Sequence, residues 1–335
     1  MKTAARIAVI IPFYQSEPGI LARALDSIRA QVLPPGVRLQ VIVVDDASPV
    51  PAMAEMAGYD DDDRITWRSI RQDNAGPGGA RNTGLGYAAA IGNARYAAFL
   101  DSDDEWTPDH LANAVAALDQ GYDFYFSDHR REGHFDSYFA MIDLMGLVTP
   151  ALWDRGAVLD DATRGFAPHA LDPVFLREYL SQSSTVVLRM ASQGHQRFDP
   201  ELRHASEDRM MWIQIALSGA RICVSTRSEV ECGRGVNMFY ESLEWDSPGI
   251  VTRLGSQLLF GQKLVRLPNA DAGSGARAGL REKRDLYSYL LVRNLLKGRP
   301  TGLRSLRPLM RRDPLLPLRL PFLFARFALA KRRGG

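Results

Sequence analysis

Short apolar runs alternate with longer, partly polar segments over roughly residues 6–235. The runs at 7–11, 41–44 and 96–100 are wholly apolar, and further strands are predicted at 65–70, 122–126, 184–188 and 221–226. Runs of this length that end at polar or turn residues are typical of strands buried on both faces. They predict a sheet covered by helices on its two sides.

The segments between the first runs have the spacing of amphipathic helices. Leu21, Leu25, Ile28 and Val32 recur on one helical face, and a second stripe begins at Leu111. Thr107 stands where a helix cap is expected, ahead of that second stripe. Strands that alternate with helices predict an α/β fold with a mostly parallel sheet.

Two regions depart from this alternation. Residues 129–176 have few clear periods and are expected to be an insertion beside the site, on the acceptor side; the spacing of their histidines is too irregular for a metal site. From about residue 250 the chain looks helical and basic. We expect a catalytic domain at 1–240 and a helical extension at 241–335.

Carboxylates follow two of the predicted strands. Asp45 and Asp46 end the second, and Asp101, Asp103 and Asp104 end the strand at 96–100. The carboxyl ends of parallel strands form the ligand edge of an open α/β sheet. Two carboxylates one residue apart can hold a divalent cation, so a metal–diphosphate site is predicted. The alternative is an acidic strand-to-helix loop without a ligand.

A glycine-rich turn at residues 74–84 opens the next helix. Exposed N–H groups at a helix start attract phosphate, although no Gly-Lys-Ser/Thr follows, as a P-loop requires. A tight strand-to-helix turn explains the glycines equally well. Arg81 is not explained by a turn, and its place near the carboxyl edge favours an anionic ligand.

A further pair of acids, Glu207 and Asp208, opens a predicted helix after Ser206. Acids in a first turn complement the helix dipole, so capping alone accounts for them. A catalytic carboxylate is the alternative.

Charge is distributed unevenly along the chain. The formal net charge is +2, but residues 281–335 hold 15 Lys and Arg against three acids, a net +12. Arginines recur every seven residues from Arg312 to Arg333, with Leu and Phe between them. Pro314, Pro317 and Pro321 are expected to prevent a long helix there, apart from 322–333. The segment suits either a membrane interface or a helix docked on its own domain.

Three further features of the sequence bear on the cellular compartment in which the protein is expected. No uncharged run approaches the ~20 residues of a spanning helix. The apolar run at 7–11 is short and lacks a cleavage site, so we expect a core strand rather than a signal peptide. Two cysteines form no disulfide framework, and a reducing compartment is expected.

Five motifs in one order resemble the inverting family-two nucleotide-sugar glycosyltransferases, which have the GT-A fold. The resemblance covers roughly residues 6–235, and the segment 233–238 is also similar to members of the succinoglycan type. The motifs are Val9 to Tyr14, Val43 to Ser48, Asn74 to Gly84, Phe99 to Trp106, and Glu207-Asp208 with Trp212 four residues on. Ala47 departs from the Gly of many relatives, without affecting the roles.

The resemblance implies a nucleotide site at the start of the chain. Pro12 and Tyr14 would lie where the first strand meets the nucleotide. Asp45 would contact uracil or ribose, with Asp46 beside it. Arg81 matches the arginine near the nucleotide.

The resemblance also implies a separate role for each of the remaining acidic residues. Asp103 would bind Mn²⁺ or Mg²⁺, and Asp101, also a candidate ligand, would touch ribose or donor sugar, with Ser102 between them; Asp104 is expected to be structural. Asp208 matches the general base, and Glu207 would orient or contact the acceptor.

The expected function is transfer of a hexose from UDP-glucose or UDP-galactose to a saccharide or polyprenyl-diphosphate-linked acceptor in cell-surface polysaccharide synthesis. We expect a cytoplasmic enzyme, peripheral on the inner face of the membrane, with no nucleic-acid partner. The alternatives are a sugar nucleotidyltransferase and a catalytically inactive membrane-assembly partner. A sugar nucleotidyltransferase would have an arginine-containing phosphate loop directly after the first strand. Residues 12–17 occupy that position and contain no arginine, which argues against this alternative.

Overall fold

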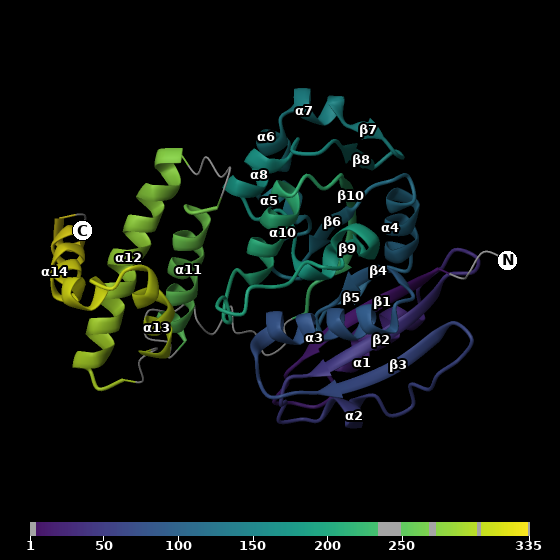
Figure 1. Cartoon of the computed structure of the whole chain (residues 1–335), viewed down its shortest axis with the longest axis horizontal. Coiled ribbons are helices and arrows are strands. Elements are labelled where there is room, and N and C mark those ends of the chain that lie inside the picture. The colour runs from purple at the N-terminus through teal and green to yellow at the C-terminus, as the bar shows by residue number, and fades with distance from the viewer. Residues whose placement is uncertain (1–4, 234–248, 268–272, 300–302, 334–335) are drawn as a thin grey trace. The chain divides into compact units, whose positions relative to one another are not determined.

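The computed structural model describes residues 5–233, 249–267, 273–299 and 303–333 (Figure 1). The chain forms two compact units. The first comprises Met1–Phe198 and Met211–Val236, and the second comprises Asp199–Met210 and Asn237–Gly335. The boundary expected at 240 stays a prediction. The segment 233–238 lies outside the described residues, apart from Gly233.

A ten-stranded sheet organises the first unit, in the order β3-β2-β1-β4-β9-β6-β10-β8-β7, with β5 paired to β10. Its strands are β1 (Arg6–Phe13), β2 (Arg38–Asp45), β3 (Ile65–Arg71), β4 (Ala94–Phe99), β5 (Glu105–Trp106), β6 (Phe124–Arg130), β7 (Ala157–Val158), β8 (Thr163–Phe166), β9 (Val186–Arg189) and β10 (Ile222–Glu231).

The parallel strands β3, β2, β1 and β4 carry the predicted apolar runs. Chain order reverses at β1, because β2 pairs on one side of it and β4 on the other. Ligands of open α/β sheets bind at such a switch point, beyond the carboxyl ends of the strands. The loops after β1, β2 and β4 therefore meet at the expected ligand edge.

The second half of the sheet is mixed. β9 lies antiparallel between β4 and β6, while β10 is parallel to β6. The region expected to be an insertion supplies β7 and β8, and β8 pairs antiparallel with β10. Part of that region thus extends the sheet.

Helices cover the sheet on both faces (Figure 1). They are α1 (Leu21–Arg29), α2 (Ala52–Glu55), α3 (Gly76–Ile91), α4 (His110–Leu118), α5 (Tyr138–Met141), α6 (Leu144–Val148), α7 (Pro150–Arg155), α8 (Asp172–Arg177), the 3₁₀ turn Ser183–Thr185, α9 (Met190–Gln193) and α10 (Glu207–Leu217).

Two local expectations were wrong. Val32 lies beyond the end of α1 and is 59% exposed, because the chain leaves the helix at Ala30. Thr107 precedes α4 by a turn; its carbonyl accepts from the His110 N–H, and Asp109 occupies the cap position without a side-chain bond.

Aromatic rings join α10 to the sheet. The Trp212 ring lies 5.8 Å from the Phe99 ring at the end of β4, and 5.7 Å from Phe198. All three side chains are buried. This contact fixes the first-unit part of α10 against the strand that leads into the acidic loop.

The described residues of the second unit form four further helices: α11 (Ile250–Leu264), α12 (Gly273–Leu296), α13 (Leu303–Arg312) and α14 (Leu316–Arg333). The expectation that prolines prevent a long helix was wrong, because α14 continues through Pro321. Pro317 lies in its first turn, where a missing N–H costs nothing. Leu316 and Leu323 are buried on one face of α14, and this packing offsets the bond lost at Pro321.

Most of the regularly spaced arginines are used inside this unit. Arg312 pairs with Glu201 at 2.8 Å, and Arg326 donates to Asp285 at 2.9 Å. Hydrogen bonds from Lys263 and Arg312 lower the pKa of Glu201 to about 2. α14 packs on α12, where Tyr289 stacks on Phe324. Within the described ranges, no helix combines the length and apolarity that crossing a membrane requires.

The packing of α3 on β1 predicts unequal effects of alanine at two glycines of the same helix. A Cβ at Gly84 would lie 2.5 Å from Cγ2 of Ile10, whereas a Cβ at Gly86 would meet nothing within 4 Å. Gly84→Ala should lower the free energy of unfolding by about 1–3 kcal/mol through overpacking. Gly86→Ala should raise it by about 0.5–1 kcal/mol. Urea unfolding of both variants measures this; equal effects would contradict the close helix–strand contact.

Candidate active site at the carboxyl edge of the sheet

Gln15 connects the three loops that follow β1, β2 and β4. Its side-chain amide donates to the hydroxyl of Ser102 at 2.9 Å, and its N–H donates to the hydroxyl of Ser48 at 2.8 Å. The Ser48 hydroxyl donates back to the Gln15 carbonyl. Gln15 is buried. Sequence reasoning missed it, because a glutamine after a strand carries no signal of burial.

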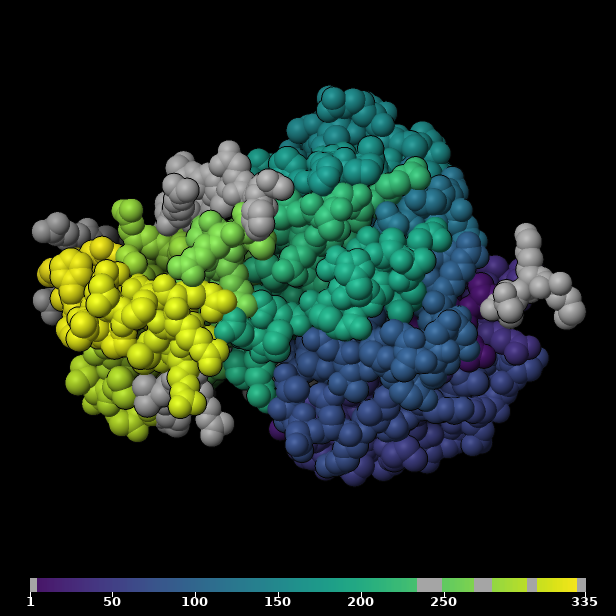
Figure 2. All heavy atoms as spheres, viewed as in Figure 1, coloured from purple at the N-terminus to yellow at the C-terminus, as the bar shows by residue number. Residues whose placement is uncertain are grey.

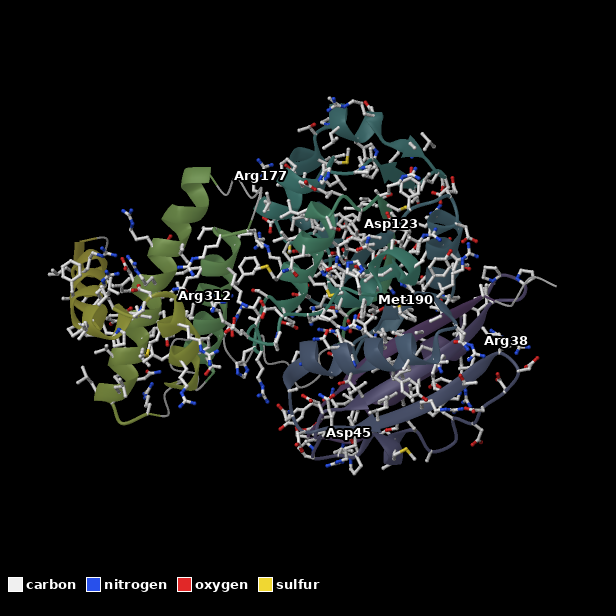
Figure 3. All side chains as sticks on the ribbon, viewed as in Figure 1. Arg38, Asp45, Asp123, Arg177, Met190 and Arg312 are labelled. Carbon is white, nitrogen blue, oxygen red and sulfur yellow. The ribbon has the colours of Figure 1, made fainter. Side chains whose placement is uncertain are left out.

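Asp45 is buried at the end of β2 (Figure 3) and shapes the loop that follows. Its carboxylate accepts from the N–H groups of Ser48 and Ala52 at 2.8 and 3.0 Å, and pairs with Arg71 at 3.2 Å. Ala47 has a φ of 57°, in the left-handed region. Glycine adopts this conformation without a steric cost, which accounts for the glycine that the family resemblance leads us to expect at position 47.

Asp46 anchors the start of α3. Its carboxylate accepts from the N–H groups of Ala75 and Gly76, each at 2.8 Å, and from the Gln72 amide at 2.7 Å. The first donors of the helix are therefore already occupied by a side chain. The glycine-rich segment is better described as a tight turn held by Asp46 than as a phosphate loop.

Arg81 and Asp101 form a partly buried ion pair. The guanidinium lies 2.6 Å from the Asp101 carboxylate, and its side chain is 4% exposed against 28% for Asp101. The other carboxylate oxygen accepts from Gln182 at 3.3 Å, and the Asp101 N–H donates to Ser184. Asp101 is thus held in one orientation, with its charge balanced by α3.

Asp104 is buried beside this pair, and its contacts are in line with the structural role expected for it. Its carboxylate accepts from the Ser184 hydroxyl at 2.6 Å, the Gln182 amide at 2.5 Å and the Gly233 N–H at 2.9 Å. Arg131 donates to the Gly233 carbonyl at 2.7 Å. The acidic loop is thereby tied to the ends of β6 and β10 and to the 3₁₀ turn before β9.

Burial and neighbouring carboxylates raise the pKa of Asp103 and of Asp104. Burial and the charge of Asp101 raise the pKa of Asp103 to about 6. Burial and the charges of Asp103 and Asp101 raise that of Asp104 to about 8. A site with this excess of negative charge favours a bound cation.

Asp103 is the carboxylate that fits a divalent cation. Within the described part of the chain, its side chain accepts no hydrogen bond from another residue, whereas Asp101 and Asp104 are both engaged. Nor do the described residues contain a group of three or more His, Cys, Asp or Glu that could hold a metal. This donor set suits Mg²⁺ or Mn²⁺ that takes most ligands from a diphosphate and water, not a cation bound by protein alone.

Pro12 and Tyr14 lie at the end of β1. Pro12 pairs with Val44 in the parallel ladder, and Tyr14 is 47% exposed just beyond it. An exposed aromatic ring at a sheet edge is available for stacking on a base. Its contact with a nucleotide stays a prediction.

Glu207 and Asp208 form the first turn of α10, in the part of that helix that belongs to the second unit. Glu207 is buried, and Asp208 accepts from the Arg209 N–H at 2.6 Å. Trp212, one helical turn later, belongs to the first unit and packs on Phe99. The catalytic roles of both acids stay predictions.

Comparison with known proteins decides the family. The sequence model of glycosyl transferase family 2 matches residues 8–150. The succinoglycan biosynthesis protein ExoW of Rhizobium meliloti strain 1021 is 36% identical over 247 residues, which cover 73% of each chain. The chain belongs to glycosyltransferase family 2. A second relative, the succinoglycan biosynthesis protein ExoO of the same organism, is 40% identical over 114 residues, covering 34% of this chain and 30% of ExoO.

Solved structures show the fold of this family 2 glycosyltransferase. S. aureus TarS 1–349 in complex with UDP-GlcNAc has a TM-score of 0.53 at 20% identity, covering 86% of this chain and 72% of TarS. The mannosyltransferase PcManGT of Pyrobaculum calidifontis, in complex with GDP-Man and Mn²⁺, has a TM-score of 0.51 at 17% identity, covering 95% and 85%. The GT-A fold expected from the sequence is confirmed.

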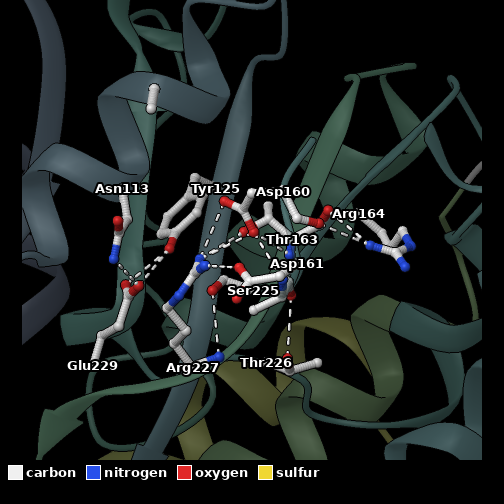
Figure 4. A network of polar contacts seen from close by, with 12 residues as sticks. Asn113, Tyr125, Asp160, Asp161, Thr163, Arg164, Ser225, Thr226, Arg227 and Glu229 are labelled. Atoms are coloured by element: carbon white, nitrogen blue, oxygen red, sulfur yellow. Dashed lines mark hydrogen bonds and ion pairs between the residues drawn. The ribbon is translucent and has the colours of Figure 1, made fainter. Parts of the chain in front are cut away.

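In this glycosyltransferase a second polar network, centred on β10, holds the segment that follows the acidic loop. Glu229 on β10 is buried and accepts from Tyr125 at 2.8 Å and Asn113 at 2.8 Å (Figure 4), and it contacts the His110 ring at 2.8 Å. Its own carbonyl accepts from the Thr107 N–H. Since Thr107 directly follows β5, Glu229 fixes the exit of the acidic loop. Nothing in the sequence marked it.

Replacing Asp104 should change both the pH dependence of the free energy of unfolding and the rate of sugar transfer. In the metal-free folded protein its carboxyl holds a proton up to about pH 8, while in the unfolded chain it ionises near 4. The folded state therefore binds more protons between these values, and the free energy of unfolding falls as pH rises. Asp104→Asn should flatten this fall between about pH 6 and 8, measured by urea unfolding in EDTA.

The same variant should transfer sugar about tenfold or more slowly, because asparagine has only one acceptor oxygen, so that either Gly233 or Ser184 loses its acceptor and the acidic loop shifts. Asp109→Asn, an exposed acid in the following turn, is the control and should behave as the wild type. An unchanged pH slope and an unchanged transfer rate in Asp104→Asn would show that this carboxylate does not position the loop.

Proposed function

We propose that this chain is an inverting hexosyltransferase. It takes a hexose from a UDP-sugar, with UDP-glucose and UDP-galactose favoured, and transfers it to a hydroxyl of a growing cell-surface polysaccharide. Two observations support this: the match to ExoW over 73% of both chains, and the edge where Arg81, Asp101 and Asp103 meet. TarS in complexes with UDP and UDP-GlcNAc supports a UDP donor by fold similarity.

The nucleotide would bind across the loops after β1 and β2. Tyr14 offers an exposed ring for the base. Asp45 and Asp46, which already accept backbone N–H groups, would set the loop backbone around uracil and ribose. Such pre-paired carboxylates position their loop more than they bind ligand directly. The contact that the sequence assigns to Asp45 thus requires one of its oxygens to accept a further hydrogen bond, which carboxylates can do.

The diphosphate would lie near Asp103, which would hold Mn²⁺ or Mg²⁺. That cation, when bound, neutralises the charge that develops on the leaving diphosphate. Asp101, fixed by Arg81, would accept from a hydroxyl of the ribose or donor sugar, next to Ser102. The ion pair with Arg81 holds this carboxylate in one orientation.

The acceptor hydroxyl must lose a proton as it attacks the anomeric carbon. A carboxylate in the first turn of a helix is kept ionised by the dipole and suits a general base. Asp208 has this position in α10, and Glu207 beside it would orient the acceptor. A single displacement inverts the anomeric carbon, so no covalent nucleophile is required.

The acceptor that we favour is a polyprenyl-diphosphate-linked oligosaccharide on the inner face of the cell membrane. The names of ExoW and ExoO, both succinoglycan biosynthesis proteins, support an exopolysaccharide product. The basic C-terminal region would bring the enzyme to this surface as a peripheral protein.

A panel of UDP-glucose, UDP-galactose, UDP-GlcNAc and GDP-mannose, each with Mn²⁺, Mg²⁺ or EDTA, tests the proposal. Release of UDP from a UDP-hexose that is lost in EDTA supports it. Turnover of GDP-mannose alone, or equal turnover in EDTA, would contradict the donor or the metal.

Asp103→Ala should weaken the Mn²⁺-dependent affinity for UDP by about tenfold or more, because the cation loses its protein ligand. Isothermal titration with and without Mn²⁺ measures this. Asp60→Ala, an exposed acid in a distant loop, is the matched control and should bind as the wild type. Unchanged affinity in Asp103→Ala would exclude it as the ligand.

Asp208→Asn should bind UDP normally but transfer about 10²–10⁴-fold more slowly, since asparagine cannot accept the proton. Asparagine has nearly the same shape as aspartate and keeps an acceptor oxygen for the Arg209 N–H, so a residue that only stabilises the first turn of α10 would leave the rate nearly unchanged. Rates at saturating donor and acceptor distinguish the two roles. A wild-type rate in Asp208→Asn would assign the acid to this structural role.

A further inference from the structure

The outward face of α14 is apolar along most of its described length. Leu318, Phe322 and Leu329 are 79%, 66% and 57% exposed, and Leu315 just before the helix is 50% exposed. Leu318, Phe322, Ala325 and Leu329 recur at i, i+4, i+7 and i+11, which places them in one stripe. We call these four residues with Leu315 the apolar stripe.

This clustering is unusual within the chain. Five of the 14 large apolar side chains that are exposed among the described residues fall between positions 310 and 329. The opposite face of α14, with Leu316 and Leu323, is buried, and Phe324 stacks on Tyr289 of α12. The helix therefore uses one face for its own unit and leaves the other without a partner in the described structure. The C-terminal helices are yellow in Figure 2.

Cationic side chains border the stripe. Arg319 and Arg326 lie along one side of it by helical position, and both are partly exposed, at 47% and 38%. In the preceding α13, Arg307, Met310 and Arg311 line a hollow on the surface. Arg311 is 75% exposed although it approaches Glu201 at 3.5 Å.

We propose that α14 lies in the interface of an anionic lipid membrane, with the apolar stripe buried among the acyl chains and Arg307 and Arg311 on lipid phosphates. A helix with one apolar face, flanked by arginines, has the composition of an interfacial helix. The charge of the tail complements anionic headgroups. The same charge disfavours a second copy as the occupant, because a symmetric contact would place identical arginines opposite one another.

The inference deepens the proposed function, since it assigns the membrane contact to particular residues. It also replaces the evenly spaced arginines with other residues as the source of that membrane contact. Arg312, Arg319 and Arg326 are engaged within the unit, so their regular spacing does not by itself create a lipid site. The exposed leucines and phenylalanine, together with the arginines of α13, carry the contact instead.

Co-sedimentation of the full chain with vesicles tests the proposal, and it needs neither donor nor acceptor. A failure here therefore leaves the UDP-release result untouched. The wild type should bind vesicles that contain phosphatidylglycerol about tenfold or more tightly than phosphatidylcholine vesicles. The double variant L318Q/F322Q should lose about tenfold or more of this affinity, and R307Q/R311Q should lose the preference for anionic lipid.

The matched control is M53Q/V158Q, which replaces two equally exposed apolar residues of the first unit, at 68% and 69%. It should bind vesicles within about twofold of the wild type, because neither residue belongs to the stripe. All of these side chains are exposed, so unfolding midpoints should not change. Three results would overturn the proposal: no binding by the wild type, equal binding by L318Q/F322Q, or a wild-type dimer that L318Q/F322Q converts to monomers without any vesicle affinity.

Discussion

Buried carboxylates at the carboxyl edge of the sheet hold the candidate site together. A carboxylate out of water is stable only when donors surround it. Asp46 takes its donors from the start of α3, and Asp104 takes its donors from the 3₁₀ turn and Gly233. Each acid thus ties its own strand end to a segment far away in the chain. The loops between them are fixed before any ligand binds.

This arrangement has a consequence for the electrostatics of the edge. Arg81 pairs with Asp101 at 2.6 Å, whereas Arg131 and Arg23 act on Asp103 too weakly to offset burial and the neighbouring acids, and the pKa values of Asp103 and Asp104 rise. This concentration of acids lowers the stability of the folded protein. A divalent cation bound at Asp103, as we propose, would relieve the repulsion and would couple substrate binding to stabilisation of the site.

The sequence was most informative where burial dictates residue type. The strands β1, β2 and β4 are largely buried on both faces, so they read as apolar runs, and their order located the edge. It was least informative about polar partners. Gln15, Gln182 and Glu229 are buried, yet their residue types are common on surfaces, and only tertiary structure brings them to their acids. The direction of β9 was equally hidden, because a short apolar run does not encode which neighbours it pairs with.

The C-terminal helices show the same limit in another form. Prolines suggested an interrupted helix, but packing of Leu316 and Leu323 maintains α14 through Pro321. Evenly spaced arginines suited either a membrane interface or a helix docked on its own domain, and the acids that pair with Arg312 and Arg326 lie far away in sequence. The spacing of residues did encode the apolar face of α14, which lies between these arginines.

The central claim is that a prearranged carboxyl edge binds a nucleoside diphosphate through a cation on Asp103. A crystal structure with UDP and Mn²⁺, with the metal located by anomalous scattering, tests it most directly. The account predicts Mn²⁺ between Asp103 and the diphosphate, with the bonds from Ala75 and Gly76 to Asp46 and from Gly233 to Asp104 unchanged. Manganese bound away from Asp103, or loops that rearrange to release Asp46 and Asp104, would contradict it.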